Sequence, residues 1–137
     1  MPTWTPGWEQ MPPALADFFE ARHLATLTTL RPDGRPHVVP VGVALDVERR
    51  CAWVITFPES RKARNVAASP GGHVALCHVD GRVWATIEGR ATLTSDADEV
   101  ARAVERYAAR YRQPKERPDR VALRVEVDRV LHGAALA

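Results

Sequence analysis

Residues 73–95 read HVALCHVDGRVWATIEGRATLTS. Two strand-like runs, rich in apolar and β-branched residues, flank the pair Asp80-Gly81. An Asp-Gly pair in that position is the strongest short-range signal for a β-hairpin. We therefore predict two antiparallel strands over residues 73–79 and 82–95. Gly89 lies inside the second run and predicts a bulge or a bend there.

Further strands are predicted on both sides of this hairpin. Their sequences are HLATLTTL (residues 23–30), PHVVPVGVAL (36–45), CAWVITF (51–57) and VALRVEV (121–127). The turn-forming sequence RPDG at 31–34 joins the first two. Pro40 and Gly42 interrupt the second run, which indicates an edge strand, a bulge, a barrel corner or a close approach of a ligand to the backbone.

Three helices complete the prediction, over residues 13–22, 61–68 and 96–112. The first twelve residues are rich in proline and are expected to form an irregular arm. Six strands in hairpin order with helices between some of them favour one domain over residues 1–137, built as a closed or partly closed antiparallel barrel. The sequence contains neither a GxGxxG pattern nor a P-loop, so the usual nucleotide-binding folds are not expected.

Composition limits the possible functions. The 137 residues are 45% hydrophobic and 26% charged, as in soluble globular proteins, and the formal charge of +2 is too small to indicate nucleic acid as the main partner. Two cysteines, Cys51 and Cys77, are too few for a disulfide framework or a structural zinc site, which predicts a reducing, cytoplasmic location. No apolar run approaches 18 residues, so the chain is expected neither to span a membrane nor to be exported.

The segment TFPESRKARN, residues 56–65, is the part of the sequence that is most informative about a binding site. A predicted strand ends there and a helix begins, and the first helical turn offers free backbone N–H groups beside Ser60, Arg61 and Lys62. This combination predicts a phosphate site. A plain capped helix favours acidic residues in its first turn, whereas this helix has one of the chain's two lysines there. The alternative is an ordinary helix with a solvated basic face.

Other reactive side chains are poorly arranged for catalysis. His73 and His78 lie five residues apart on one predicted strand, so they face opposite sides and cannot chelate one metal ion. Cys51 and Cys77 lie in apolar strands without a neighbouring base and are expected to be packed as small hydrophobic residues. His37 is either half-exposed or part of a ligand pocket. With no acid, base or nucleophile in evidence, no catalytic side chain is predicted, and the reactive group is expected to come from a cofactor.

Three blocks of the sequence resemble a known family. LATLTTLRPDGRPHVVPVGVALD, WVITFPESRKARNVAASP and VALCHVDGRVWATIEGRATL are similar to successive blocks of the pyridoxamine-phosphate-oxidase-like split-barrel flavin and deazaflavin proteins, and S-R-K-x-x-N is the most specific part. The later AVERYAARYRQPKERPDRVALRVEVDRVL adds a likeness to the short actinobacterial branch that uses coenzyme F420 to reduce biliverdin. The resemblance implies a six-stranded split barrel and a homodimer with the cofactor between the two barrels.

The resemblance also implies the roles of individual residues. By this resemblance the phosphate is bound by Ser60, Arg61, Lys62 and Asn65. The ribityl chain is flanked by Thr56 and Phe57. The ring passes over His37, Val39, Pro40 and Val41, and Trp84 occupies the place of a further cofactor contact. Arg64, Arg82 and Arg129 are candidates for the propionates of biliverdin.

Three functions follow from the resemblance as expectations. The first is an F420-dependent reductase that passes a hydride to a conjugated acceptor, with biliverdin as the expected substrate. The second keeps the fold and uses FMN, although the strand VVPVGV lacks the basic phosphate contacts of the FMN oxidases, which favours the deazaflavin. The third is a protein that binds a flavin, a deazaflavin or haem without turnover.

Overall fold

The protein is built around one antiparallel sheet. The computed structural model describes residues 2–137. In chain order its elements are β1 (Thr3–Trp4), the 3₁₀ turn η1 (Trp8–Gln10), α1 (Pro13–Glu20), β2 (Ala25–Leu30), β3 (Pro36–Val41), β4 (Ala44–Asp46), β5 (Cys51–Thr56), α2 (Arg61–Ala68), β6 (Gly72–Asp80), β7 (Val83–Thr94), α3 (Ala97–Arg110), β8 (Val121–His132) and the 3₁₀ turn η2 (Ala134–Leu136).

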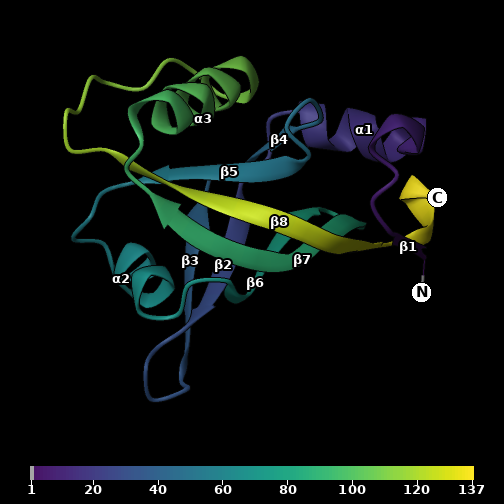
Figure 1. Ribbon diagram of the computed structural model, residues 1–137. Coiled ribbons are helices and arrows are strands. Elements are labelled where there is room, and N and C mark those ends of the chain that lie inside the picture. The colour runs from purple at the N-terminus through teal and green to yellow at the C-terminus, as the bar shows by residue number, and fades with distance from the viewer. Residues whose placement is uncertain (1) are drawn as a thin grey trace.

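The strands follow the order β3-β2-β6-β7-β8-β5-β4, and β1 pairs with the far end of β8. All pairings are antiparallel, so the predicted fold class is confirmed. Figure 1 shows the long strands β7 and β8 crossing the middle of the molecule. The two chain ends lie close together at one side.

The β6–β7 hairpin forms where the sequence predicts it. Asp80 pairs with Val83, and Gly81 between them adopts φ +61°, a backbone conformation that glycine tolerates. The predicted bulge at Gly89 is also confirmed, because the register between β7 and β8 shifts between Glu88 and Gly89. A side chain at position 89 would collide with the Glu126 carbonyl, so this bend requires glycine.

The described residues form eight strands instead of six, and one difference lies in the run 36–45. This run divides into β3 and β4 at Gly42 and Val43. Gly42 permits the close approach of an aromatic ring of α3: a Cβ at Gly42 would lie 2.7 Å from Tyr107 Cε2. Tyr111 Oη accepts a hydrogen bond from the Val43 N–H at 3.1 Å, which holds the chain in this bend.

The second difference lies in the N-terminal arm: the expectation of an irregular arm over residues 1–12 is wrong for Thr3–Trp4 and Trp8–Gln10, and residue 1 lies outside the described residues. Thr3 pairs with Leu131 to form β1, and η1 follows. Trp4 and Trp8 are buried in the main core, with their ring centres 5.4 Å apart in an edge-to-face arrangement. Burial of two indoles offsets the ordering of this proline-rich segment, so the arm is part of the domain.

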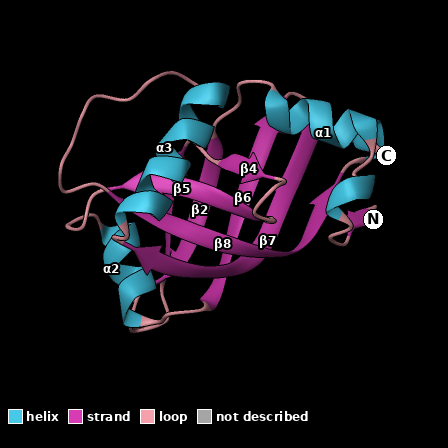
Figure 2. Ribbon diagram, turned by 45° about the horizontal axis from the view of Figure 1, so that its top comes forward, coloured by secondary structure: helices cyan, strands magenta, loops and turns pink. Residues whose placement is uncertain are grey.

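The helices sit around the sheet and each begins as the sequence predicts. Proline residues open α1, while Ser60 caps α2 and Asp96 caps α3. Helix α3 lies along β5 and β4, and α2 contacts β7 and β2, an arrangement visible in Figure 2.

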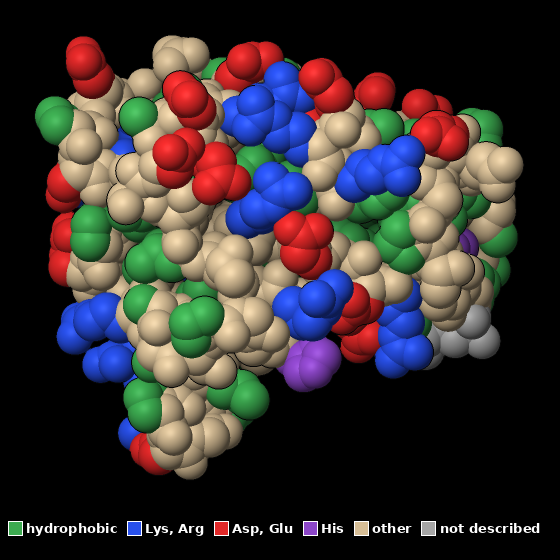
Figure 3. All heavy atoms as spheres, viewed as in Figure 1, with side chains coloured by type: hydrophobic (Ala, Val, Ile, Leu, Met, Phe, Trp, Pro, Cys, Tyr) green, Lys and Arg blue, Asp and Glu red, His purple; other side chains and the backbone are tan. Residues whose placement is uncertain are grey.

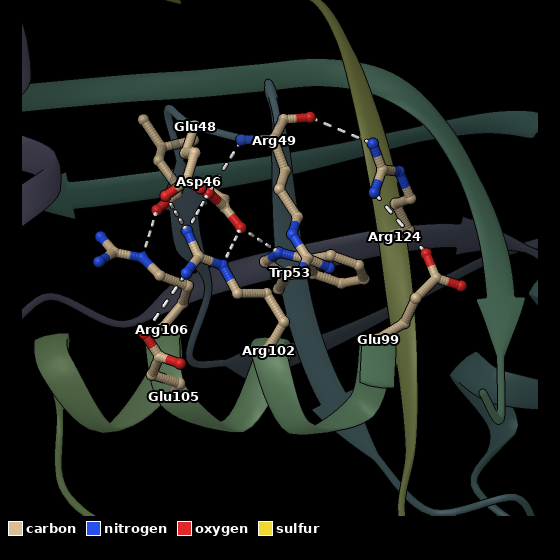
Figure 4. Close-up of polar contacts among 10 residues, drawn as sticks. Asp46, Glu48, Arg49, Trp53, Glu99, Arg102, Glu105, Arg106 and Arg124 are labelled. Carbon is tan, nitrogen blue, oxygen red and sulfur yellow. Dashed lines mark hydrogen bonds and ion pairs between the residues drawn. The ribbon is translucent and has the colours of Figure 1, made fainter. Parts of the chain in front are cut away.

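A buried ion pair fastens α3 to the sheet (Figure 4). Arg102 donates to both carboxylate oxygens of Asp46 at 2.8 Å, and Trp53 Nε1 donates to the same carboxylate at 2.9 Å. The Asp46 side chain is only 1% exposed. These bonds to the charged form hold the pKa of Asp46 well below its usual range despite burial. The contact fixes the helix that forms one wall of the candidate site.

Candidate functional site

Ser60 organises the junction between β5 and α2. Its Oγ accepts the backbone N–H of Ala63 at 3.3 Å and donates to the carbonyl of Phe57 at 2.9 Å. Because Ser60 has one hydroxyl proton, Thr56 must be the donor in the 3.0 Å contact between the two hydroxyls. The Ser60 hydroxyl is thus fully used within the chain, and its role here is to shape the start of the helix.

The first turn of α2 gathers positive charge. Lys62 is half-buried, and no described residue hydrogen-bonds or pairs with it. Burial lowers the pKa of its ammonium group. Arg61 is exposed on the same turn. Together with the helix N-terminus these two cations make the junction electropositive, as the sequence predicts.

His37 on β3 faces this positive region. Burial lowers the pKa of His37, and three nearby cations lower it further: Arg31, Arg61 and Lys62. The ring is therefore neutral at pH 7. Its Nδ1 is enclosed and has no hydrogen-bond partner among residues 2–137.

Asn65 lies on the buried side of α2, where it is almost completely enclosed. Its Nδ2 donates to Thr29 Oγ1 on β2 at 3.0 Å, and its Oδ1 has no partner in the described chain. Thr29 pairs directly across the sheet with His37. Asn65 therefore ties α2 to the strand next to β3 and sets the position of the helix over the sheet.

A groove of about 260 Å³ runs past the same junction. Its walls come from β3, β5, α2, α3 and the loop before β8. The lining residues are Pro40, Val41, Gly42, Ile55, Thr56, Phe57, Lys62, Tyr107, Pro114 and Arg120. Five predicted cofactor-binding residues thus lie on one groove: Pro40, Val41, Thr56, Phe57 and Lys62.

Unpartnered buried polar atoms occur in this groove and around α2. In the part of the chain that the structure describes, four buried side-chain nitrogen or oxygen atoms have no hydrogen-bond partner. Those of His37 and Asn65 lie beside α2, and Arg120 Nε belongs to a residue that lines the groove. Buried polar atoms in native proteins are nearly always satisfied by protein, water or ligand. The groove therefore has the character of a binding site for a polar or anionic molecule.

Sequence reasoning missed the far wall of the groove. Tyr107 belongs to the predicted helix 96–112, and no binding role was predicted for it or for residues 113–119. The structure folds this loop back, so that the guanidinium carbon of Arg117 lies 3.7 Å from the centre of the Phe57 ring. No local pattern marks Arg120 among the chain's many arginines. Its position depends on the long-range return of the chain from α3 to β8.

The structure does not bring Trp84 to this groove within one chain. Trp84 precedes Ala85, which pairs with His132 at one end of β7. At the other end Thr94 pairs with Ala122, which in turn pairs with Ile55, a residue that lines the groove. Ten residues of strand separate Trp84 from Thr94, a length of roughly 33 Å. A role for Trp84 at a cofactor stays a prediction that needs a second chain.

The three candidate arginines for propionates lie in three separate places. Arg64 is exposed on α2 and donates to the Glu59 carbonyl at 3.1 Å, and Arg82 is exposed in the β6–β7 turn. Arg129 on β8 is paired with Glu88 at 2.5 Å and lines a separate hollow of about 560 Å³. One chain does not assemble them into a single site.

The cysteines and remaining histidines have other surroundings. Burial raises the pKa of the Cys51 thiol to about 12, so it is not a nucleophile at neutral pH. Cys51 and Cys77 are both free. His73 is exposed and His78 is fully buried, on opposite faces of β6 as predicted. Among residues 2–137, no three His, Cys, Asp or Glu side chains gather as metal ligands.

Two further features concern possible partners. On the face shown in Figure 3, basic and acidic side chains are interspersed and form no continuous basic stripe. Within residues 2–137, every helix is too short or too polar to cross a membrane.

The fold and the chain's sequence define its family. The pyridoxamine 5'-phosphate oxidase family matches residues 11–132, and the chain belongs to this family. A curated relative, the F420H(2)-dependent biliverdin reductase of Mycobacterium tuberculosis (strain CDC 1551 / Oshkosh), is 49% identical over 119 residues, which cover 87% of this chain and 85% of the relative. The resemblance seen in the sequence is thereby confirmed.

Solved structures show the same fold. A conserved hypothetical protein from Mycobacterium tuberculosis superposes with a TM-score of 0.75 at 23% identity, covering 96% of this chain and 90% of the other. A structure described as an F420 reductase gives a TM-score of 0.65 at 23% identity, with 84% and 94% covered. At these identities the likeness establishes the fold alone.

Proposed function

We propose that this protein is a coenzyme F420-dependent reductase that transfers a hydride to biliverdin and releases bilirubin. The 49% identity to a biliverdin reductase of that type, over most of both chains, supports the cofactor and the substrate. The structural observation that carries the proposal is the groove beside α2, whose lining includes the half-buried Lys62 and the unpartnered Nε of Arg120. F420 would bring a phosphate and carboxylates to such a groove.

The groove residues fit a planar ring with an anionic tail. Backbone N–H groups of the first turn of α2, with Arg61 and Lys62, would bind the phosphate. Ser60 and Asn65 would act by fixing that turn, through the bonds to Phe57 and Thr29. Thr56 and Phe57 would flank the ribityl chain. His37, Val39, Pro40 and Val41 on β3 would support the ring.

The chain's own contribution to the reaction is placement. Reduced F420, when bound, supplies a hydride from C5 of its deazaflavin ring, and the acceptor also takes one proton from water or a neighbouring cation. The apolar walls at Pro40, Val41 and Phe57 would keep water from the ring and hold the acceptor carbon within about 3 to 3.5 Å of C5. No side-chain nucleophile is needed.

A second copy of the chain would complete the site. The groove of one chain holds about 260 Å³, below the roughly 300 to 1,000 Å³ usual for ligand pockets. Leu30, Val38 and Val79 are exposed by 54%, 55% and 63%. Strand register places all three on one face of the β3-β2-β6 sheet, the face away from the buried residues Leu27 and Leu76. A homodimer through this face would cover them and could bring Trp84 of one copy to the other's groove.

The free thiols of Cys51 and Cys77 suit a reducing compartment, and we place the protein in the cytoplasm.

Parallel titration tests the cofactor. Protein purified from a host that lacks F420 is titrated with F420 and with FMN, and binding is followed by the fluorescence of each cofactor. We expect tighter binding of F420. Yellow protein that retains FMN through purification, with no measurable F420 binding, would overturn the proposal in favour of an FMN enzyme.

Light scattering at micromolar concentration tests the dimer. We expect a mass near 30 kDa, twice the 15.2 kDa of one chain. A mass of one chain at all concentrations, with full cofactor binding, would contradict the shared site.

A further inference from the structure

Arg120 occupies an unusual position for a surface arginine. It ends the loop after α3 and directly precedes β8, and a turn bond from its N–H to the Arg117 carbonyl at 3.1 Å shapes the loop there. The side chain is half-buried and its Nε is enclosed without a hydrogen-bond partner. No ion pair involves Arg120 among the described residues. An enclosed guanidinium N–H with no partner is costly, because it gives up water without replacement.

The nearby acidic groups are taken by another arginine. Arg117 lies 3.0 Å from Asp119 and 3.6 Å from Glu59, and it also stacks on Phe57 at 3.7 Å. The guanidinium carbon of Arg120 is farther from the Phe57 ring, at 5.9 Å from its centre. The stack and the two ion pairs hold the loop against the groove, and Arg120 itself forms no ion pair, although its charge still acts on Asp119 from a greater distance.

The groove itself brings two unpaired cations together. Lys62 from α2 and Arg120 from the loop line the same 260 Å³ space, and none of its described lining residues is acidic. Neither cation has a partner in the described chain. An anion bound between these two walls of the groove would give both cations a partner of opposite charge.

We propose that Lys62 and Arg120 bind the same anionic group of the bound molecule, a phosphate ester or a carboxylate, from two walls of the groove. This inference rests on the proposed function for the identity of the molecule. The arginine supplies a planar pair of N–H donors that fixes the direction of the anion, and the lysine supplies a mobile point charge. The loop 111–120 is then a binding element of the site.

The experiment compares ligands with and without the anionic tail. Wild type, Arg120→Gln, Arg120→Lys and the control Arg112→Gln are titrated with F420 and with its deazaflavin alcohol, which ends at the ribityl chain. Arg112 is exposed in the same loop. FMN and riboflavin form a second pair that differs only by a phosphate. Thermal unfolding shows that each variant is folded.

We expect Arg120→Gln to weaken F420 binding roughly ten- to hundredfold, the loss usual for one charge-assisted hydrogen bond. Binding of the deazaflavin alcohol should change less than twofold, Arg120→Lys should recover part of the loss, and Arg112→Gln should match wild type. A loss seen with F420 and with FMN assigns the anion as the phosphate. A loss with F420 alone assigns it as a carboxylate of the tail.

Equal losses for F420 and the alcohol, or no loss for either, would overturn the inference, since Arg120 would then only shape the ring wall or the loop. Failure of the proposed function has a different signature: wild type would not bind F420. In that case the FMN and riboflavin pair decides the inference, and wild type that binds no member of either pair contradicts it.

Discussion

The side-chain amide of Asn65 donates a hydrogen bond to Thr29 Oγ1 at 3.0 Å, and both residues are buried. This hydrogen bond links α2 to β2, the strand that pairs with β3 at the edge of the sheet. The helix start, with Lys62 and Arg61, is therefore held at a fixed place relative to His37 across the sheet. The geometry of the proposed phosphate site depends on this bond.

Replacing Asn65 should disturb both stability and binding. Asn65→Leu leaves the buried Thr29 hydroxyl without its donor, so we expect a loss of about 1 to 3 kcal/mol in the free energy of unfolding and weaker cofactor binding. Thr29→Val is the matched control, and the double variant should recover part of the stability because both polar partners are gone. Denaturant unfolding gives the values. Fully additive losses would show that the bond does not couple the two residues.

Lys62 should matter for the ligand and not for the fold. Lys62→Gln removes a cation that has no partner in the described chain, so we expect cofactor binding weaker by roughly 1.5 to 3 kcal/mol and a nearly unchanged melting temperature. The only other lysine, the exposed Lys115, provides the control Lys115→Gln. Fluorescence titration measures both variants. Unchanged binding in Lys62→Gln would remove this residue from the site.

His78 should make the fold sensitive to acid. Its Nε2 lies 3.1 Å from Arg110 Nη1, and burial, followed by the charge of Arg110, lowers the pKa of His78 to about 3. The unfolded chain binds a proton near pH 6.5 and the native protein does not, so stability should fall as the pH drops from about 6.5 toward 3, by at most a few kcal/mol.

His78→Gln keeps an acceptor for Arg110 and cannot titrate. Its stability should therefore depend less on pH than that of wild type between pH 6.5 and 4.5, a range above the titration of most carboxyl groups. Urea unfolding at several pH values compares the two proteins. Parallel pH profiles would show that the native protein protonates His78 as readily as the unfolded chain does.

Turnover should survive the loss of both thiols. Cys51→Ala and Cys77→Ala remove side chains that the account does not use, and the pKa of about 12 for Cys51 already excludes a thiolate at neutral pH. We expect unchanged turnover and a modest packing loss at the fully buried Cys51. A variant that folds and binds F420 but does not turn over would show that a cysteine takes part in the chemistry.

Local sequence signals predict the elements that depend on local chemistry. Asp80-Gly81 predicts the central hairpin and Gly89 predicts its bulge, because tight turns and bends need particular backbone angles. Ser60 likewise predicts the start of α2, since a capping hydroxyl is required there.

The features that the sequence hides depend on distant contacts. The arm containing Trp4 and Trp8 becomes ordered only because the end of β8 and the main core receive it. The sequence at Gly42 is compatible with an edge strand, a bulge, a barrel corner or a ligand close to the backbone. In the structure the rings of Tyr107 and Tyr111 occupy the space where a side chain at position 42 would lie. Arg120 reaches the groove through a loop whose course no local pattern specifies.

Hydride transfer from reduced F420 to biliverdin is the reaction that we propose for this chain. The direct measurement mixes the purified protein with both compounds under anaerobic conditions and follows the absorbance of oxidised F420 together with that of bilirubin. We expect the two signals to rise together, in equal amounts, and only when the protein is present. Bound F420 with neither signal, while a quinone, a nitroaromatic compound or an enone is reduced, would contradict the assignment of biliverdin as substrate.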